Sequence, residues 1–235
     1  MILTLIACTA GTTNTLPGPH SVVEVGNPER VIGVATYLPP EVPDVPPTID
    51  TAWAALHETK LILDETYAGT EELEWETPDL IADLALGIVD LAFESPDAGY
   101  NRVEVRPRTG RARPPGAPPE LEDASFVIDG HRSDGVPFRI LSDTEDEIAL
   151  TGAFQLGEDQ SALALGFDLN TWFEGIDLDA ATVKGNGEIE ISHDENRGLL
   201  DRFERNLAGS VALVDDQNGD GFVDDGEPVL TSSGR

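Results

Sequence analysis

Apolar and polar residues alternate along short segments in the middle of the chain, and turn-forming residues separate these segments. In the run SALALGFDL, Leu163, Leu165 and Phe167 fall on one face, whereas Ala164 and Gly166 fall on the other. A period of two is typical of a half-buried β-strand. Because no helices alternate with these strands, the pattern predicts an all-β fold, an antiparallel β-sandwich of the immunoglobulin-like kind. The segments expected as strands are 30–38, 124–130, 136–142, 147–156, 161–169 and 187–192.

Three further segments fit more than one structure. Residues 51–63 are compatible with a helix, but alternating positions favour a strand. Residues 78–93 carry leucines at helical spacing, and a buried strand pair broken at Gly87 fits nearly as well. The proline-rich, polar segment 102–120 is expected to form a long exposed loop or crossover within one domain, because the strands on both sides of it need partners.

Near the C-terminus the apolar residues change their spacing. They recur every three or four positions from Leu200 to Val214, which predicts a helix over 196–214 with Asn196 as its N-cap. We favour this helix because the apolar face continues through Gly209. The alternative is that Gly209 ends the helix and that residues 210–214 form a short strand.

The stretch DQNGDGFVDDGE, residues 216–227, has the spacing of an EF-hand calcium loop. Ca²⁺ is a hard cation that takes six to eight oxygen ligands at roughly 2.3–2.6 Å, so carboxylates and carbonyls suit it. Gly221, at the sixth position, permits the sharp turn that brings both halves of the loop around one ion. Oxygen ligands are expected from Asp216, Asn218, Asp220, Asp224 and Glu227, together with the backbone carbonyl of Phe222.

The surroundings of this loop favour one structural Ca²⁺ over a calcium sensor. We find one such loop, and Pro228 replaces the apolar residue that normally starts the exiting helix. A sensor needs a helix pair that opens onto a groove, and the short C-terminal tail lacks the residues for it. A single loop outside the cytosol fits the weak extracellular class, with Kd of about 10⁻⁴ to 10⁻³ M. The alternative is an acidic loop that binds no ion.

Charge narrows the choice of partners. The chain has 45 acidic and 14 basic residues, a net charge of −31. Such a surface repels phosphates, which argues against nucleic acid as a partner. A cluster of arginines stands out against this background, and we expect it to neutralise the protein's own acidic surface rather than to form a partner site. These arginines are Arg102, Arg106, Arg108, Arg111 and Arg113.

The sequence lacks the motifs of the common catalytic sites, so we expect a non-enzymatic protein. It contains no nucleophile elbow, phosphate-binding loop or dinucleotide fingerprint. Acidic groups such as Asp143 and its neighbours are expected to be solvated charge. The histidines are scattered and form no zinc motif; they are His20, His57, His131 and His193.

The tryptophans suggest an alternative function. Trp53, Trp75 and Trp172 are candidates for a sugar-stacking platform, which would make the chain a carbohydrate- or surface-binding adhesion module of the cell envelope. Its partner would then be a surface glycan or an envelope protein. Trp172, beside Phe173 at a strand end, is more typical of a core residue. The sequence does not specify the oligomeric state.

The single cysteine lies in an apolar N-terminal stretch. Leu5-Ile6-Ala7-Cys8 looks like a bacterial lipobox, in which a signal peptide is cut before a cysteine that becomes lipidated at Cys8. Residues 1–7 are short for a signal peptide and lack its positive charge, so either the true start lies upstream or Met1 opens an ordinary apolar N-terminus. Lipidation predicts an extracytoplasmic protein, in the periplasm or at the cell surface, that contacts the membrane through its lipid anchor only.

Three segments in this order carry a family resemblance: SPDAGYNRVEVRP (95–107), ASFVIDGHRSDGVPFRI (124–140) and LALGFDLNTWF (163–173). They resemble secreted bacterial lipoproteins with a domain of unknown function that folds as a transthyretin-like β-sandwich. The resemblance implies a surface or periplasmic location and no established enzyme activity. The expected organisation is a signal remnant and tether over 1–29, a β-sandwich domain over 30–195, and a helix with the calcium loop over 196–235.

Overall fold

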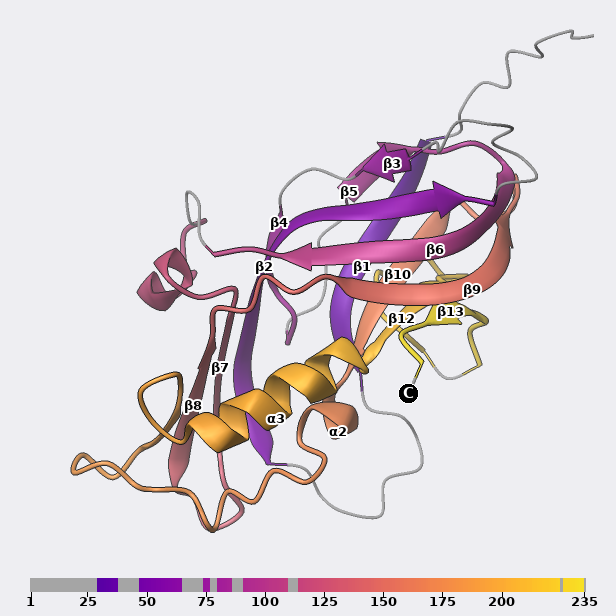
Figure 1. Ribbon diagram of the computed structural model, residues 1–235. Helices are drawn as coiled ribbons and strands as arrows, with labels where there is room; N and C mark the ends of the chain where they lie inside the picture. The colour runs from indigo at the N-terminus through magenta and orange to yellow at the C-terminus, as the bar shows by residue number, and fades with distance from the viewer. Residues whose placement is uncertain are drawn as a thin grey trace, which may run out of the picture.

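The protein is built mostly from β-strands, which form two mixed sheets that curve into a half-barrel (Figure 1). Among the described residues, no helix has the length and apolar character needed to cross a membrane. The computed structural model describes residues 29–37, 47–64, 74–76, 80–85, 91–109, 114–224 and 226–234.

The smaller sheet has five strands in the order β13-β12-β10-β1-β5. β1 and β10 run parallel, from Val31 opposite Ala162 to Tyr37 opposite Asp168, and the other pairs are antiparallel. The strands are β1 (Glu29–Tyr37), β5 (Leu91–Glu94), β10 (Ala162–Asp168), β12 (Val211–Asp215) and β13 (Val229–Ser232).

The larger sheet has eight strands, and the long strand β2 organises it. The first half of β2 pairs with β7 and its second half with β6, while β3 and β4 also pair with it. β8 and β11 run parallel. The strands are β2 (Thr48–Leu63), β3 (Glu74–Glu76), β4 (Leu80–Asp83), β6 (Ala98–Pro107), β7 (Phe126–His131), β8 (Pro137–Ser142), β9 (Ile148–Leu156) and β11 (Ile189–Ile191).

The apolar faces of the two sheets share one core. Leu163, Leu165 and Phe167 of β10 are fully buried in it, as their alternation predicts. Phe126 of β7 meets Phe167 edge to face, with ring centroids 6.3 Å apart, and so joins the larger sheet to the smaller one. Burial of each such side chain stabilises the fold by roughly 1.5–3 kcal/mol.

Within the described ranges, three short helical segments accompany the sheets: α3 (Arg197–Ala208), α2 (Leu169–Trp172) and a 3₁₀ turn, η1 (Pro119–Glu122). α3 packs near α2 and β8 (Figure 1), and it also contacts β11. Trp172 is fully buried, meets Phe203 of α3 edge to face, and donates a hydrogen bond from Nε1 to Ser210 Oγ at 2.9 Å. The interpretation of Trp172 as a core residue is therefore confirmed, and a buried ring is not available for stacking on a sugar.

The predicted helix over 196–214 is wrong in its last third. The helix ends at Ala208, and the backbone N–H of Gly209 closes it by donating to the carbonyls of Asn206 and Leu207. β12 then begins at Val211, which is the alternative that the glycine suggested. The chain turns there because β12 completes the pairing of β10.

Asn196 occupies the predicted N-cap position, but its side chain does not cap the helix. It accepts a hydrogen bond from the backbone N–H of Thr182 at 2.8 Å and donates to the carbonyl of Glu190 at 2.7 Å. Asn196 therefore ties the start of α3 to the segment around β11.

The strand prediction for 51–63 is confirmed by β2. In 78–93 the structure has two strands, β4 and β5, which pair with β2 and β1 rather than with each other; Gly87 lies outside the described residues. The loop predicted over 102–120 is wrong up to Pro107, because β6 continues to that residue.

The structure confirms the coarser part of the sandwich prediction, a mostly β fold. The sheets are mixed rather than purely antiparallel, because the β1–β10 and β8–β11 pairs are parallel. Parallel neighbours need a long connection, and the segments between these strands are long enough to provide it.

Candidate metal centre

The predicted calcium loop connects the last two strands of the five-stranded sheet. β12 ends at Asp215, β13 begins at Val229, and the backbone N–H of Asp215 donates to the carbonyl of Pro228 at 3.0 Å. The loop therefore closes a β-hairpin. The helices that flank a loop of this spacing in an EF-hand are replaced by strands, since β12 and β13 pair with each other and β12 with β10.

The first half of the loop folds around Asp216. This carboxylate is 4% exposed and accepts hydrogen bonds from the backbone N–H groups of Gly219, at 2.7 Å, and Gly221, at 2.8 Å. Both glycines have positive φ, 73° and 81°, a conformation that residues with a side chain rarely adopt. The two glycines thus allow the backbone to wrap around a buried carboxylate.

The middle of the loop brings three polar side chains to one point. The Asn218 side-chain amide donates to Asp220 Oδ2 at 3.1 Å and to Asp224 Oδ2 at 2.8 Å. Asn218 Oδ1 accepts from the backbone N–H of Asp220, and Asp220 Oδ1 accepts from that of Phe222, both at 2.9 Å. Asp220 and Asp224 therefore aim an oxygen each at the same small region, where the amide group now lies.

Glu227 holds the two ends of the loop together. Its carboxylate accepts from the backbone N–H of Gln217 through Oε1 at 3.1 Å, and from that of Asp224 through Oε2 at 2.9 Å. Both oxygens of the last predicted ligand therefore face the loop backbone. A carboxylate that accepts hydrogen bonds from two backbone N–H groups is fixed in position.

The loop lies directly against the small-residue face of the five-stranded sheet. A Cβ atom on Gly33 of β1 would lie 2.5 Å from Gly221 Cα, and a Cβ on Gly166 of β10 would lie 2.5 Å from Val223 Cγ2. Val223 packs on a small buried cluster that includes Ala164. The face of β10 that carries Ala164 and Gly166 is therefore covered by the loop.

The donor set fits a hard divalent cation. Residues 215–227 carry six carboxylates, and no lysine, arginine or histidine occurs between 206 and 234. In the described part of the loop no ion pair offsets these charges, so a bound cation would relieve their mutual repulsion. Oxygens on opposite sides of Ca²⁺ lie up to about 5 Å apart, so the ligands need not all be close neighbours.

A different group of side chains gathers more tightly. Among the described residues, Asp143, His193 and Glu204 form the set of three acidic or histidine side chains whose ligand atoms all lie within 4.8 Å of one another. The loop carboxylates that the structure describes form no such set. Sequence spacing gave no signal for this group, because its members are 50 and 11 residues apart and meet only in the fold.

In the arginine cluster, Arg102 and Arg106 form ion pairs with acidic side chains. Arg106 binds Glu58 at 2.6 Å, Glu104 at 3.0 Å and Glu147 at 2.9 Å, and Arg102 also binds Glu104 and Glu147. These contacts agree with the interpretation that the arginines neutralise the protein's own acidic surface. Arg108 lies beside His57 at 3.3 Å, whereas Arg111 and Arg113 lie outside the described residues, as does the lipidation candidate Cys8.

In comparisons with known proteins, the chain matches no family model, no curated protein and no solved structure.

Proposed function

We propose that this chain is a non-enzymatic β-domain that binds one structural Ca²⁺ through residues 216–227. The observation that carries the proposal is the convergence of Asp220 and Asp224 on one point inside a loop that encloses the buried carboxylate of Asp216. Bound Ca²⁺ would take these oxygens, with those of Asn218 and Glu227 and the carbonyl of Phe222.

The role proposed for the ion is to fasten the C-terminal hairpin to the sheet. The loop touches β1 at Gly33 and β10 at Gly166, and β13 lies against β9 of the other sheet. Cross-linking the loop through one ion would hold β12 and β13 in this position. A switch-like role has less support, because strands flank the loop and a helix pair that opens onto a groove is the element such switches use.

The location proposed with this function is outside the cytoplasm, with a lipid anchor at Cys8. A single loop of this kind belongs to the weak class, with Kd of about 10⁻⁴ to 10⁻³ M, and such sites fill only where calcium is plentiful. The support is the sequence pattern Leu5-Ile6-Ala7-Cys8.

Titration calorimetry of the full chain with CaCl₂ tests the proposal. We expect one Ca²⁺ per chain, loss of most of the binding heat in Glu227→Gln, and unchanged binding in Glu158→Gln, which alters an exposed carboxylate in the turn after β9. Equal heats in all three proteins, or no calcium-specific heat in the wild type, would reduce the loop to a simple acidic hairpin connection.

A further inference from the structure

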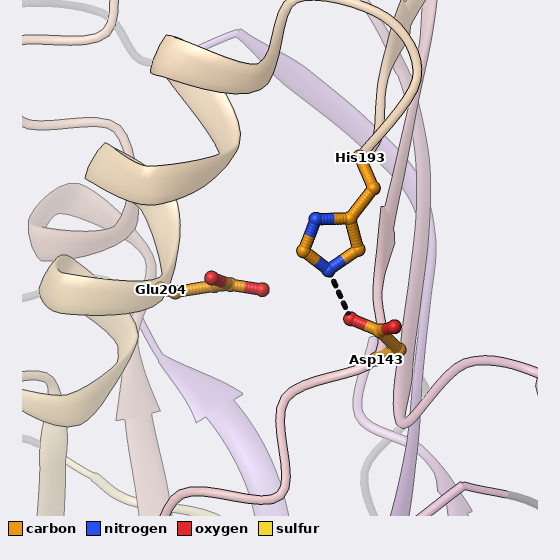
Figure 2. A group of neighbouring side chains, drawn as sticks. All are labelled: Asp143, His193 and Glu204. Carbon is orange, nitrogen blue, oxygen red and sulfur yellow. Dashed lines mark hydrogen bonds and ion pairs between the residues drawn. The ribbon is translucent and has the colours of Figure 1, made fainter.

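Three side chains from separate elements meet beside α3. Asp143 follows β8, His193 follows β11, and Glu204 lies in α3 and points toward the imidazole (Figure 2). His193 Nε2 lies 2.6 Å from Asp143 Oδ1, and the ligand atoms of all three residues lie within 4.8 Å of one another.

We propose that Asp143, His193 and Glu204 form a second cation site, and that it takes a transition-metal ion of the Zn²⁺ type. Zn²⁺ accepts both imidazole nitrogen and carboxylate oxygen as ligands, and sites with three protein ligands leave a fourth position open to water. Imidazole suits zinc and its neighbours, whereas Ca²⁺ and Mg²⁺ prefer oxygen ligands. The ligand chemistry of this site therefore differs from that of the 216–227 loop.

The fold supports this arrangement beyond the three ligands. Glu204 Oε1 accepts a hydrogen bond from the hydroxyl of the buried Ser142 at 2.8 Å, and such a partner orients a ligating carboxylate. Glu204 is only partly exposed and lies close to the carboxylate of Asp143. A cation placed between the three side chains would offset the repulsion between these two carboxylates.

The surroundings are acidic and accessible. Asp143 and His193 line a cavity of about 260 Å³ together with Glu120, Glu190 and Asp194, and Glu204 lines a neighbouring cavity of about 330 Å³. Oxygen Oε2 of Glu120 is buried and has no hydrogen-bond partner within the described chain. The cavity beside Asp143 and His193 carries no lysine or arginine, and clefts lined by one sign of charge raise the local concentration of the opposite ion. Asp143 and His193 are about half exposed, so an ion can reach them from solvent.

Little movement is needed to admit the ion. Ligands at about 2.0–2.2 Å around a tetrahedral Zn²⁺ lie roughly 3.4 Å from each other. Asp143 and His193 must separate by less than about 1 Å from their hydrogen-bonded distance, and both side chains are about half exposed. Glu204 already lies within the 4.8 Å limit.

A second histidine provides a matched control. His131 Nδ1 lies 2.6 Å from Asp50 Oδ2, and this pair is as exposed as His193 and Asp143. No third acidic or histidine ligand gathers at His131 among the described residues. A plain histidine–aspartate ion pair is therefore present in the same molecule, without the feature that defines the proposed site.

The test is titration of the full chain with Zn²⁺ after chelator treatment, and with Co²⁺ as a spectroscopic probe. All proteins carry Cys8→Ser, so that the single thiol contributes no ligand. We expect one Zn²⁺ per chain, a tenfold or greater loss of affinity in His193→Gln and in Glu204→Gln (a loss of the order seen even for outer-shell partners), and no change in His131→Gln. A Co²⁺ absorption band should appear in the wild-type background and disappear in His193→Gln.

Two outcomes would overturn the proposal: absence of stoichiometric Zn²⁺ binding, or binding that His193→Gln and Glu204→Gln leave unchanged while circular dichroism shows both variants folded. Asp143→Asn, a substitution on the exposed surface, provides a third variant if Glu204→Gln does not fold. Glu227→Gln should retain Zn²⁺ binding, which separates this result from success or failure of the calcium proposal.

Discussion

Two glycines determine how closely the 216–227 loop approaches the five-stranded sheet. Gly33 and Gly166 lie on the adjacent parallel strands β1 and β10, and each leaves room for one part of the loop. Gly33 faces the backbone of Gly221, which cannot move away without unfolding the turn that holds Asp216. Packing at these two positions therefore links the sheet to the candidate metal centre.

Gly33→Ala should destabilise the protein by about 1–3 kcal/mol, because the new Cβ would lie 2.5 Å from Gly221 Cα. It should also weaken calcium binding, since the loop must shift to make room. Gly185→Ala is the matched control: a Cβ there meets nothing within 4 Å. Urea unfolding measures both variants, and equal stabilities would contradict the close contact between loop and sheet.

Tyr100 is a buried phenol whose ionisation opposes folding. It is fully buried, stacks on Phe154 with ring centroids 5.4 Å apart, and donates from Oη to the carbonyl of Pro96 at 2.9 Å. Burial raises its pKa from 10.0 to about 12, an effect that a hydrogen bond with Ser95 and the positive charge of Arg30 only partly offset. Between these two values the unfolded chain loses a proton that the folded chain keeps.

The contribution of Tyr100 to stability is therefore constant below pH 10 and declines as the pH rises from 10 toward 12. We expect the unfolding free energy to fall over this range, and to fall less steeply in Tyr100→Phe. Tyrosinate absorbance checks the cause, because the most alkaline step of the titration should be missing in the variant. An unchanged titration in Tyr100→Phe would assign that step to another tyrosine.

At the level of elements, β12 shows why the end of α3 was mispredicted. Val211 and Leu213 face the main core, while Ala212 and Val214 face the cluster under the loop, so every residue of this run is buried. Consecutive apolar residues satisfy a helical period and a strand period equally well. Gly209 carried the decisive information, because it ends the helix.

The sequence predicts the strands that bury one face, but it does not predict which strands pair with each other. β7, β8, β9 and β10 alternate or lie between clear turn signals, so sequence located them. The sequence did not predict β6, because the charged Arg102 and Arg106 on one face of this strand are typical of a polar loop. Val103 and Val105, which alternate with them, are fully buried. The parallel β1–β10 pair joins segments far apart in the chain, and no local pattern records such a contact.

Arg30 connects three elements from a buried position. It is 1% exposed at the start of β1; Nε donates to Ser95 Oγ at 2.9 Å, Nη1 donates to the carbonyl of Gly157 at 3.1 Å, and Nη2 pairs with Asp97. These partners lie in the turns before β6 and before β10. The guanidinium therefore holds the two turns against the five-stranded sheet.

Arg30→Met should lower the free energy of unfolding by about 1–3 kcal/mol, since it leaves buried Ser95 and the partly exposed Asp97 without their hydrogen-bond donor. Arg197→Met is the control, because Arg197 is exposed and lies 4.0 Å from Asp201; such surface pairs contribute about 0–1 kcal/mol. Chemical denaturation compares the two. Similar losses of unfolding free energy in the two variants would contradict a stabilising role of Arg30 beyond that of a surface ion pair.

At the scale of the whole molecule, the net charge favours both of the proposed metal sites. The net charge is −31, so acidic side chains that lie close together on the folded chain repel one another. The C-terminal loop is such a cluster, and no basic residue lies near it in sequence. Sequence spacing was enough to identify that loop as a candidate, because all of its proposed ligands lie within the single stretch 216–227. The Asp143–His193–Glu204 group required the fold, because β8, β11 and α3 each supply one member.

The measurement that tests the central claim most directly is thermal unfolding of the wild type and of Glu227→Gln in Ca²⁺ and in Mg²⁺ at equal ionic strength. Calcium at ten times Kd should stabilise the wild type by about 1.4 kcal/mol, a rise in Tm of roughly 3–6 °C for a chain of this size. Mg²⁺ should give much less, because it demands six short bonds, and Glu227→Gln should lose the calcium increment. Equal shifts with both ions, or an undiminished calcium shift in Glu227→Gln, would contradict calcium binding by residues 216–227.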